Sequence, residues 1–345
     1  NITTRTAIAR QSRFWYNGPA QSAGVGAGKR PALLKCSRSK MQTKNALELV
    51  PRPAALSLSL LGKFQAALGD QPVTLLRTRK ERALLSYLAV EADRPHRREA
   101  LAELFWPERP EGVASANLRQ SLSDVRRAIG SEYLLTTRQS VRFNAASEHW
   151  LDLAVYLAHL ESTRSHPHDN LENCPLCMGR LQQAIALYRG AFLADLELDD
   201  SRAFQEWVTQ RRERLFRQQS EALRRLTGYR RTLGDLERAR RYARQWVGLD
   251  PWSERAHRQR MEVLALSGQR RAALEQYETC RRMLAEELSL EPGPETVALY
   301  EKIRDGAIRP PVVHPPPSTL QNLPAHLTPF VGREPELSMI ERLLS

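Results

Sequence analysis

The chain has only four cysteines in 345 residues, Cys36, Cys174, Cys177 and Cys280. So few cysteines exclude the dense disulfide scaffold of a small secreted protein and suit a reducing compartment. No apolar run approaches the roughly 20 residues that a membrane-spanning helix needs. The basic start of the chain also lacks the apolar core of a signal peptide. The sequence therefore predicts a cytoplasmic protein without a membrane partner.

Signatures of catalysis are also missing. The sequence has no nucleophile elbow, no Ser/His/Asp set and no metal site with an open position. The segment "AGVGAGKR" (23–30) resembles a phosphate-binding loop. However, Ala23 replaces its first glycine, and Arg30 replaces the Ser or Thr that would hold magnesium. We therefore predict no enzymatic activity and no bound nucleotide.

Positive charge is abundant but unevenly placed. The net charge is +13, and residues 1–50 hold nine Lys or Arg against one acid, Glu48, which accounts for +8. A sequence pI near 10 favours nucleic acid as a partner. Because the excess lies in a Gly-, Ser- and Ala-containing stretch without periodicity, we interpret residues 1–54 as a basic, disordered tail and Met41 as a plausible natural start.

Residues 55–147 combine strand and helix patterns. Thr78, with Glu81 three residues later, is a capping box that starts the first helix, and Gly130 ends the third. The expected order is short strands, three helices and a hairpin, over 56–76, 78–93, 97–107, 114–130 and 133–143. This order predicts a winged helix-turn-helix domain, whose third helix enters the major groove of DNA.

The third helix has one apolar stripe, Leu118, Leu122, Val125 and Ile129, and a polar outer face. Arg can pair with guanine, and Asn or Gln with adenine, through two hydrogen bonds each. Arginines on the hairpin can reach phosphate or the minor groove. A merely solvated helix face is the alternative interpretation. The predicted DNA contacts are Asn117, Arg119, Gln120, Ser121, Arg126, Arg127, Arg138 and Arg142.

Residues 148–305 read as helices with an internal repeat. Gly234 matches Gly268, and Ala239 matches Ala273, both 34 residues apart, which is the tetratricopeptide (TPR) period of two antiparallel helices. Stacked repeats of this kind form surfaces that bind proteins. We expect Trp246 and Trp252 in the core. The predicted fold class is mainly α, a winged helix-turn-helix (α+β) followed by an α-helical TPR-like repeat domain.

These segments resemble the SARP class of bacterial transcriptional regulators. "LFWP" with "NLRQSLSDVRRAIG" is similar to their OmpR-type DNA-binding domain, and "LYRGAFL" with "EWVTQRRERL" is similar to the bacterial transcriptional activator domain that follows it. The resemblance implies binding to direct repeats near promoters, dimerisation and contact with RNA polymerase. It places Asn117, Gln120, Ser121 and Arg126 toward bases. Asp124 departs from related regulators, which often carry a basic residue there.

The C-terminal residues change character. Six prolines in residues 307–324 predict a stiff linker, which we place at 306–323. "FVGRE" and the following helix pattern are similar to the start of the AAA/NB-ARC-like ATPase domain of large SARP-type regulators. Residues 324–345 would then be the beginning of such a domain, truncated before its phosphate loop, and we expect no ATPase activity of this chain.

The segment "HPHDNLENCPLC" (166–177) has metal-ligand spacing. Two His and two Cys, namely His166, His168, Cys174 and Cys177, can fill a closed tetrahedral zinc shell, which predicts a structural zinc ion. One alternative is a redox pair at a helix N-terminus, where the helix dipole lowers a thiol pKa. The other is a polar loop with two idle cysteines.

Taken together, the sequence favours a sequence-specific transcriptional activator of the nucleoid that binds double-stranded DNA, RNA polymerase and a second copy of itself. The alternative is a TPR-type interaction scaffold, or a STAND-type signalling regulator, without direct DNA readout. An enzyme is the least favoured class, because none of its residue sets is present.

Overall fold

The computed structural model describes residues 55–167, 173–308 and 339. The predicted basic tail (1–54), almost all of the predicted linker (306–323) and the predicted ATPase-like start (324–345) therefore lie outside the described residues, apart from 306–308 and Met339.

A four-stranded sheet opens the described chain. Its first three strands form an antiparallel meander, and its fourth, β7 (His149–Leu151), arrives from far along the chain and pairs parallel to β1. Leu56 and Leu58 are fully buried, as their alternation predicts. The strand pattern predicted up to residue 76 is wrong at its end, because the third strand ends at Pro72 and Leu75 is 49% exposed. The meander consists of β1 (Leu56–Ser59), β2 (Gln65–Leu68) and β3 (Gln71–Pro72).

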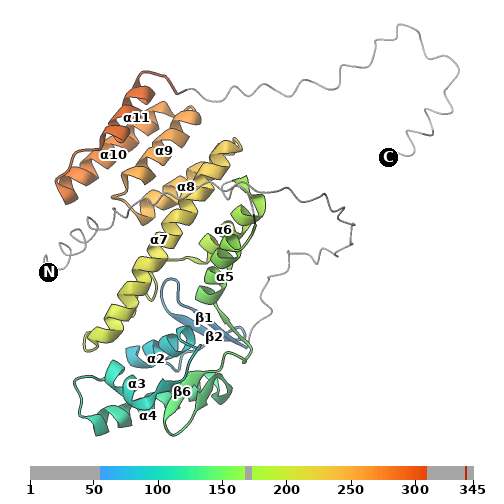
Figure 1. Cartoon of the computed structure of the whole chain (residues 1–345), viewed down its shortest axis with the longest axis vertical. Coiled ribbons are helices and arrows are strands. Elements are labelled where there is room, and N and C mark those ends of the chain that lie inside the picture. The colour runs from blue at the N-terminus through green and yellow to red at the C-terminus, as the bar shows by residue number, and fades with distance from the viewer. Residues whose placement is uncertain (1–54, 168–172, 309–338, 340–345) are drawn as a thin grey trace, which may run out of the picture. The chain divides into compact units, whose positions relative to one another are not determined.

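Three helices follow the sheet (Figure 1), namely α2 (Arg79–Val90), α3 (Arg98–Phe105) and α4 (Glu111–Ile129). The predicted capping box is confirmed: the Thr78 hydroxyl accepts from the Glu81 N–H at 3.1 Å, and the Glu81 carboxylate accepts from the Thr78 N–H at 3.3 Å. All four residues of the predicted α4 stripe are buried. Gly130 ends α4 with φ +104°, a conformation that favours glycine.

The predicted hairpin after α4 is confirmed as the wing. A short 3₁₀ turn, Ser131–Tyr133, leads into β5 (Leu134–Thr136), which pairs antiparallel with β6 (Ser140–Phe143). A third strand that the sequence did not predict, β4 (His96–Arg97), pairs with β6 directly before α3. The wing is thus fastened to the start of α3.

The rest of the described chain is helical, so the predicted mainly α fold class is confirmed. Successive helices pack on each other, and Gly234 and Gly268 adopt φ +73° and +75° in the turns after α7 and α9. In the parts of the chain that the structure describes, every helix is too short or too polar to cross a membrane. The helices are α5 (Asp152–Arg164), α6 (Pro175–Leu187), α7 (Arg202–Thr232), α8 (Leu236–Leu249), α9 (Glu254–Leu266), α10 (Arg270–Leu288) and α11 (Pro294–Arg304).

The two tryptophans expected in the helical core differ. Trp246 on α8 is 4% exposed, which confirms the prediction. Trp252 is 50% exposed, so its assignment to the core is wrong. It lies in the turn between α8 and α9, where the chain direction changes and no helix face carries the indole inward.

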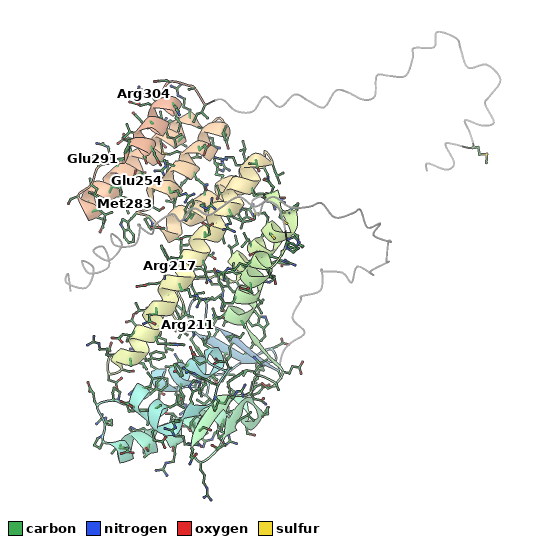
Figure 2. All side chains as sticks on the ribbon, viewed as in Figure 1. Arg211, Arg217, Glu254, Met283, Glu291 and Arg304 are labelled. Carbon is green, nitrogen blue, oxygen red and sulfur yellow. The ribbon has the colours of Figure 1, made fainter. Side chains whose placement is uncertain are left out.

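The neighbouring Glu254, labelled in Figure 2, ties α9 to α11 by accepting from the Gly293 N–H at 2.8 Å.

Helix α7 belongs to the core of both the winged helix and the helical region. Phe204 of α7 stacks against Phe105 of α3 with ring centroids 5.4 Å apart, and Trp207 lies 5.1 Å from Tyr87 of α2. The Trp207 indole N–H donates to Glu91 at 2.9 Å, and Arg211 of α7, which is labelled in Figure 2, pairs with the same carboxylate. Buried aromatic pairs of this kind contribute beyond their area alone. The two predicted domains are therefore joined by packing and not only by the chain.

A buried carboxylate fixes where the helical region begins. Asp152, the first residue of α5, is 1% exposed and accepts from the N–H groups of Leu60 and Leu61 at 2.8 to 2.9 Å. The Arg189 guanidinium bonds it at 2.9 Å. The chain after Arg189 then runs along the β1–β2 loop, where the Leu193 N–H donates to the Leu60 carbonyl at 2.9 Å.

Replacing Asp152 with Ala should lower the free energy of unfolding by about 3 kcal/mol, because buried N–H groups of the sheet lose their acceptor and Arg189 loses its partner. Urea unfolding followed by circular dichroism measures the change. Asp70→Ala is the matched control, since Asp70 is exposed in the turn between β2 and β3. A loss below about 1 kcal/mol for the Asp152 variant would mean that the carboxylate does not hold this junction.

Candidate nucleic-acid interface

Helix α4 presents its polar residues in two stripes, not one. The first stripe has the spacing i, i+4, i+8, i+11 and lies beside the wing. The second has the spacing i, i+3, i+4, i+7 and turns toward α2. Both stripes flank the buried apolar one, so two grooves run along the same helix. The first stripe is Ser115, Arg119, Ser123 and Arg126, and the second is Asn117, Gln120, Ser121 and Asp124.

We call the groove between α4, the start of α3 and the wing the wing groove. Five arginines and one glutamate, Glu99, line it. Arg98 donates through Nε to the Thr137 carbonyl at 3.0 Å and so holds the wing tip to α3. Arg126 lies 3.5 Å from the Thr136 hydroxyl across the groove. The arginines of the wing groove are Arg98, Arg119, Arg126, Arg127 and Arg138.

We call the groove on the opposite side of α4 the acidic groove. It lies between α4, the start of α2 and residues 197–200, and five carboxylates face two basic residues there. Lys80 of α2 is engaged, because its ammonium bonds Asp200 at 2.6 Å and lies 5.0 Å from the centre of the Trp106 ring. The carboxylates are Glu81, Asp124, Glu197, Asp199 and Asp200. Their combined field repels an anion on this side of α4.

The structure separates the eight predicted DNA contacts. Asn117, Gln120 and Ser121 line the acidic groove; Ser121 is 8% exposed, and Gln120 donates to Asp124 at 2.9 Å. Arg142 lines neither groove, and its Nε donates to the Ala92 carbonyl at 3.0 Å. The four brought together in the wing groove are Arg119, Arg126, Arg127 and Arg138.

Several further residues of the wing groove were not predicted, among them Ser115, Ser123 and Arg98. Ser115 could have been found, because it precedes Arg119 by four residues and so continues the same stripe toward the N-terminus of α4. Arg98 could not, because its place depends on strand β4 and on the contact with Thr137, which joins residues far apart in sequence.

The structure describes three of the four predicted zinc ligands, and it brings these three side chains together. The His166 Nδ1 lies 3.4 Å from the Cys177 sulfur and 3.7 Å from the Cys174 sulfur, and the three ligand atoms lie within 4.8 Å of one another. A hydrogen bond from the backbone N–H of Cys177 lowers the pKa of the Cys174 thiol, whereas burial raises the pKa of Cys177. His168, the fourth predicted ligand, lies outside the described residues.

Comparison with known proteins identifies a known domain in the helical region. Residues 151–304 match the family model "bacterial transcriptional activator domain". The chain is 27% identical to the regulatory protein AfsR of Streptomyces griseus over 301 residues, which cover 81% of this chain and 28% of AfsR. The chain therefore contains a bacterial transcriptional activator domain and resembles the SARP-class bacterial transcriptional regulators. The resemblance predicted from the sequence is thereby confirmed.

A solved structure of EmbR from Mycobacterium tuberculosis, in complex with a low affinity phosphopeptide, has the same fold. The TM-score is 0.55 at 22% identity, and the match covers 73% of this chain and 65% of EmbR. In this chain, the region matched by the family model starts at Leu151, the last residue of β7. The chain spans 28% of AfsR and 65% of EmbR, so it corresponds to part of each.

Proposed function

We propose that the chain is a sequence-specific DNA-binding transcriptional activator that inserts α4 into the major groove and sets its wing groove against the phosphate backbone. The observation that carries the proposal is the division of charge around α4: five arginines and one glutamate line one groove, and five carboxylates and two basic residues line the other. On a helix face that only contacts solvent, we would expect positive and negative side chains to be mixed and not divided between two grooves.

The physical fit follows from size and charge. A helix with side chains is about 10–12 Å across, and the major groove is about 12 Å wide, so α4 fits into the groove. Attraction by the wing groove and repulsion by the acidic groove favour an approach from the wing side. Arg119 and Arg126 are then the candidates for paired hydrogen bonds to guanine, while Ser115 and Ser123 let the duplex come close.

The helical region supplies the second half of the proposed function. Its antiparallel helices α7 to α11 would offer a TPR-like surface to RNA polymerase or to a second copy bound at a neighbouring repeat. The regulator would act in the cytoplasm, on the nucleoid. Within this function, the zinc ion that the sequence predicts would support the helical region and would not be a reactant.

The alternative is an interaction scaffold or signalling regulator without direct DNA readout. It shares the helical region with the main proposal and differs only in the use of α4. Selection of bound duplexes from a random pool separates the two, because a scaffold enriches no sequence.

Replacing Arg126 with Ala should reduce discrimination between the selected duplex and a scrambled one by about 1–3 kcal/mol, because a base contact is lost. Gel-shift titration with both duplexes measures it. Arg142→Ala is the matched control, since Arg142 is engaged with Ala92 away from both grooves and should leave discrimination unchanged. If the control loses as much as the Arg126 variant, α4 is not the reading element.

Replacing Arg138 with Ala should weaken binding to all duplexes alike and reduce the salt dependence by about one phosphate contact, because the wing tip meets the backbone and not the bases. The measurement is the slope of log affinity against log salt concentration. An unchanged slope, together with unchanged discrimination in the Arg126 variant, would show that this docking is wrong.

A further inference from the structure

The connection between α5 and α6 carries a group of side chains that DNA binding does not use. His166 follows the end of α5, Cys174 is the N-cap of α6, and Cys177 lies in the first turn of α6. The Cys177 side chain is fully buried, and the other two are half-buried. Three side chains of the two types that favour zinc, one imidazole and two thiols, therefore meet at one point at the edge of the core.

The distances fit a tetrahedral ion. With zinc–sulfur bonds of about 2.3 Å and zinc–nitrogen bonds of about 2.0 Å, neighbouring ligand atoms lie roughly 3.5 to 3.8 Å apart. The observed separations from His166 Nδ1 to the two sulfurs are 3.4 and 3.7 Å. One ion bound by all three groups would hold the nitrogen at nearly equal distances from the two sulfurs.

The local backbone holds the two thiols on the same side. Pro175 occupies the first turn of α6, where its missing N–H costs nothing, and the Met178 N–H donates to the Cys174 carbonyl at 3.0 Å. A Cys-x-x-Cys segment at a helix start thus presents both sulfurs toward the end of α5. On that side the Arg180 guanidinium donates to the Ser162 carbonyl at 2.5 Å, which fixes the last turn of α5 against α6.

We propose that His166, Cys174 and Cys177 bind one zinc ion that fastens the end of α5 to the start of α6. The inference deepens the structural role given to zinc in the proposed function and rests on that role. Three protein ligands leave one tetrahedral position for water or for a further side chain. The ion closes the hairpin α5–α6, which in turn packs on α7, where the Tyr156 hydroxyl of α5 donates to Gln219 at 3.4 Å.

The ligands select zinc over harder cations. Thiolate and imidazole suit zinc, whereas magnesium and calcium prefer oxygen ligands. Cobalt(II) in a thiolate-containing tetrahedral site gives strong visible absorption, so it can report on the same position.

The test is the metal content of the full chain, purified under reducing conditions with zinc in the medium and desalted. Elemental analysis should find about one zinc per chain in the wild type and below about 0.2 in Cys177→Ser and in Cys174→Ser. Cys280→Ser is the matched control, because Cys280 is an equally buried thiol on α10 and should leave the zinc content unchanged. Cys174 is half-buried, so its variant keeps the test decisive if the Cys177 variant fails to fold.

A second measurement separates the effect of the metal ion on stability from the effect of replacing a thiol. Adding a chelator to the wild type should lower the thermal midpoint, and added zinc should restore it, whereas the Cys174 variant should respond to neither. The proposal is overturned by a wild-type zinc content below about 0.2, by zinc retained in both cysteine variants, or by a mass two hydrogens lower that marks a Cys174–Cys177 disulfide. Gel shifts with the selected duplex read the DNA function separately, so its failure leaves this result intact.

Discussion

The Asp152 carboxylate is the constraint on which the arrangement of this protein depends. It lies where β7 becomes α5, and it joins three pieces of chain by hydrogen bonds to Leu60, Leu61 and Arg189. A buried charge is tolerated only when its partners are in place, so the three pieces must meet. Because the segment after Arg189 is fixed along the β1–β2 loop, the residues that follow it are carried to the side of α4.

The acidic groove is a consequence of that path. Leu196 and Leu198 are buried, while Asp195, Glu197 and Asp199 between and beside them are exposed. In this alternation the two leucine side chains pack inward and hold the segment in place, so the carboxylates between and beside them face outward. The helical region thereby contributes three of the five carboxylates of the acidic groove, and the winged helix contributes the other two and the arginines of the wing groove.

Local signals predicted most of the fold, and contacts between distant residues account for the misses. The capping box at Thr78, the stripe from Leu118 to Ile129 and the glycine at 130 were readable because each depends on a few neighbouring residues. Strands β4 and β7 were not, since each is two or three residues long and exists only by pairing with β6 or β1. For the same reason, one polar face was predicted on α4 where the structure has two stripes. Nothing within the helix says that Asn117 and Gln120 face carboxylates from residues 197–200.

The shared packing of α7 has a consequence for how such a regulator can transmit information. Within the described residues, packing joins the proposed DNA reader to the helices that follow it, because β7 is part of the sheet and Phe204 and Trp207 pack against α3 and α2. Helix α7, with 31 residues, runs about 46 Å from that core toward the last helices. The orientation of the helices at its far end would therefore be set by the orientation of the bound DNA. Two copies bound along one duplex would present those helices at an angle and separation set by the number of base pairs between their sites.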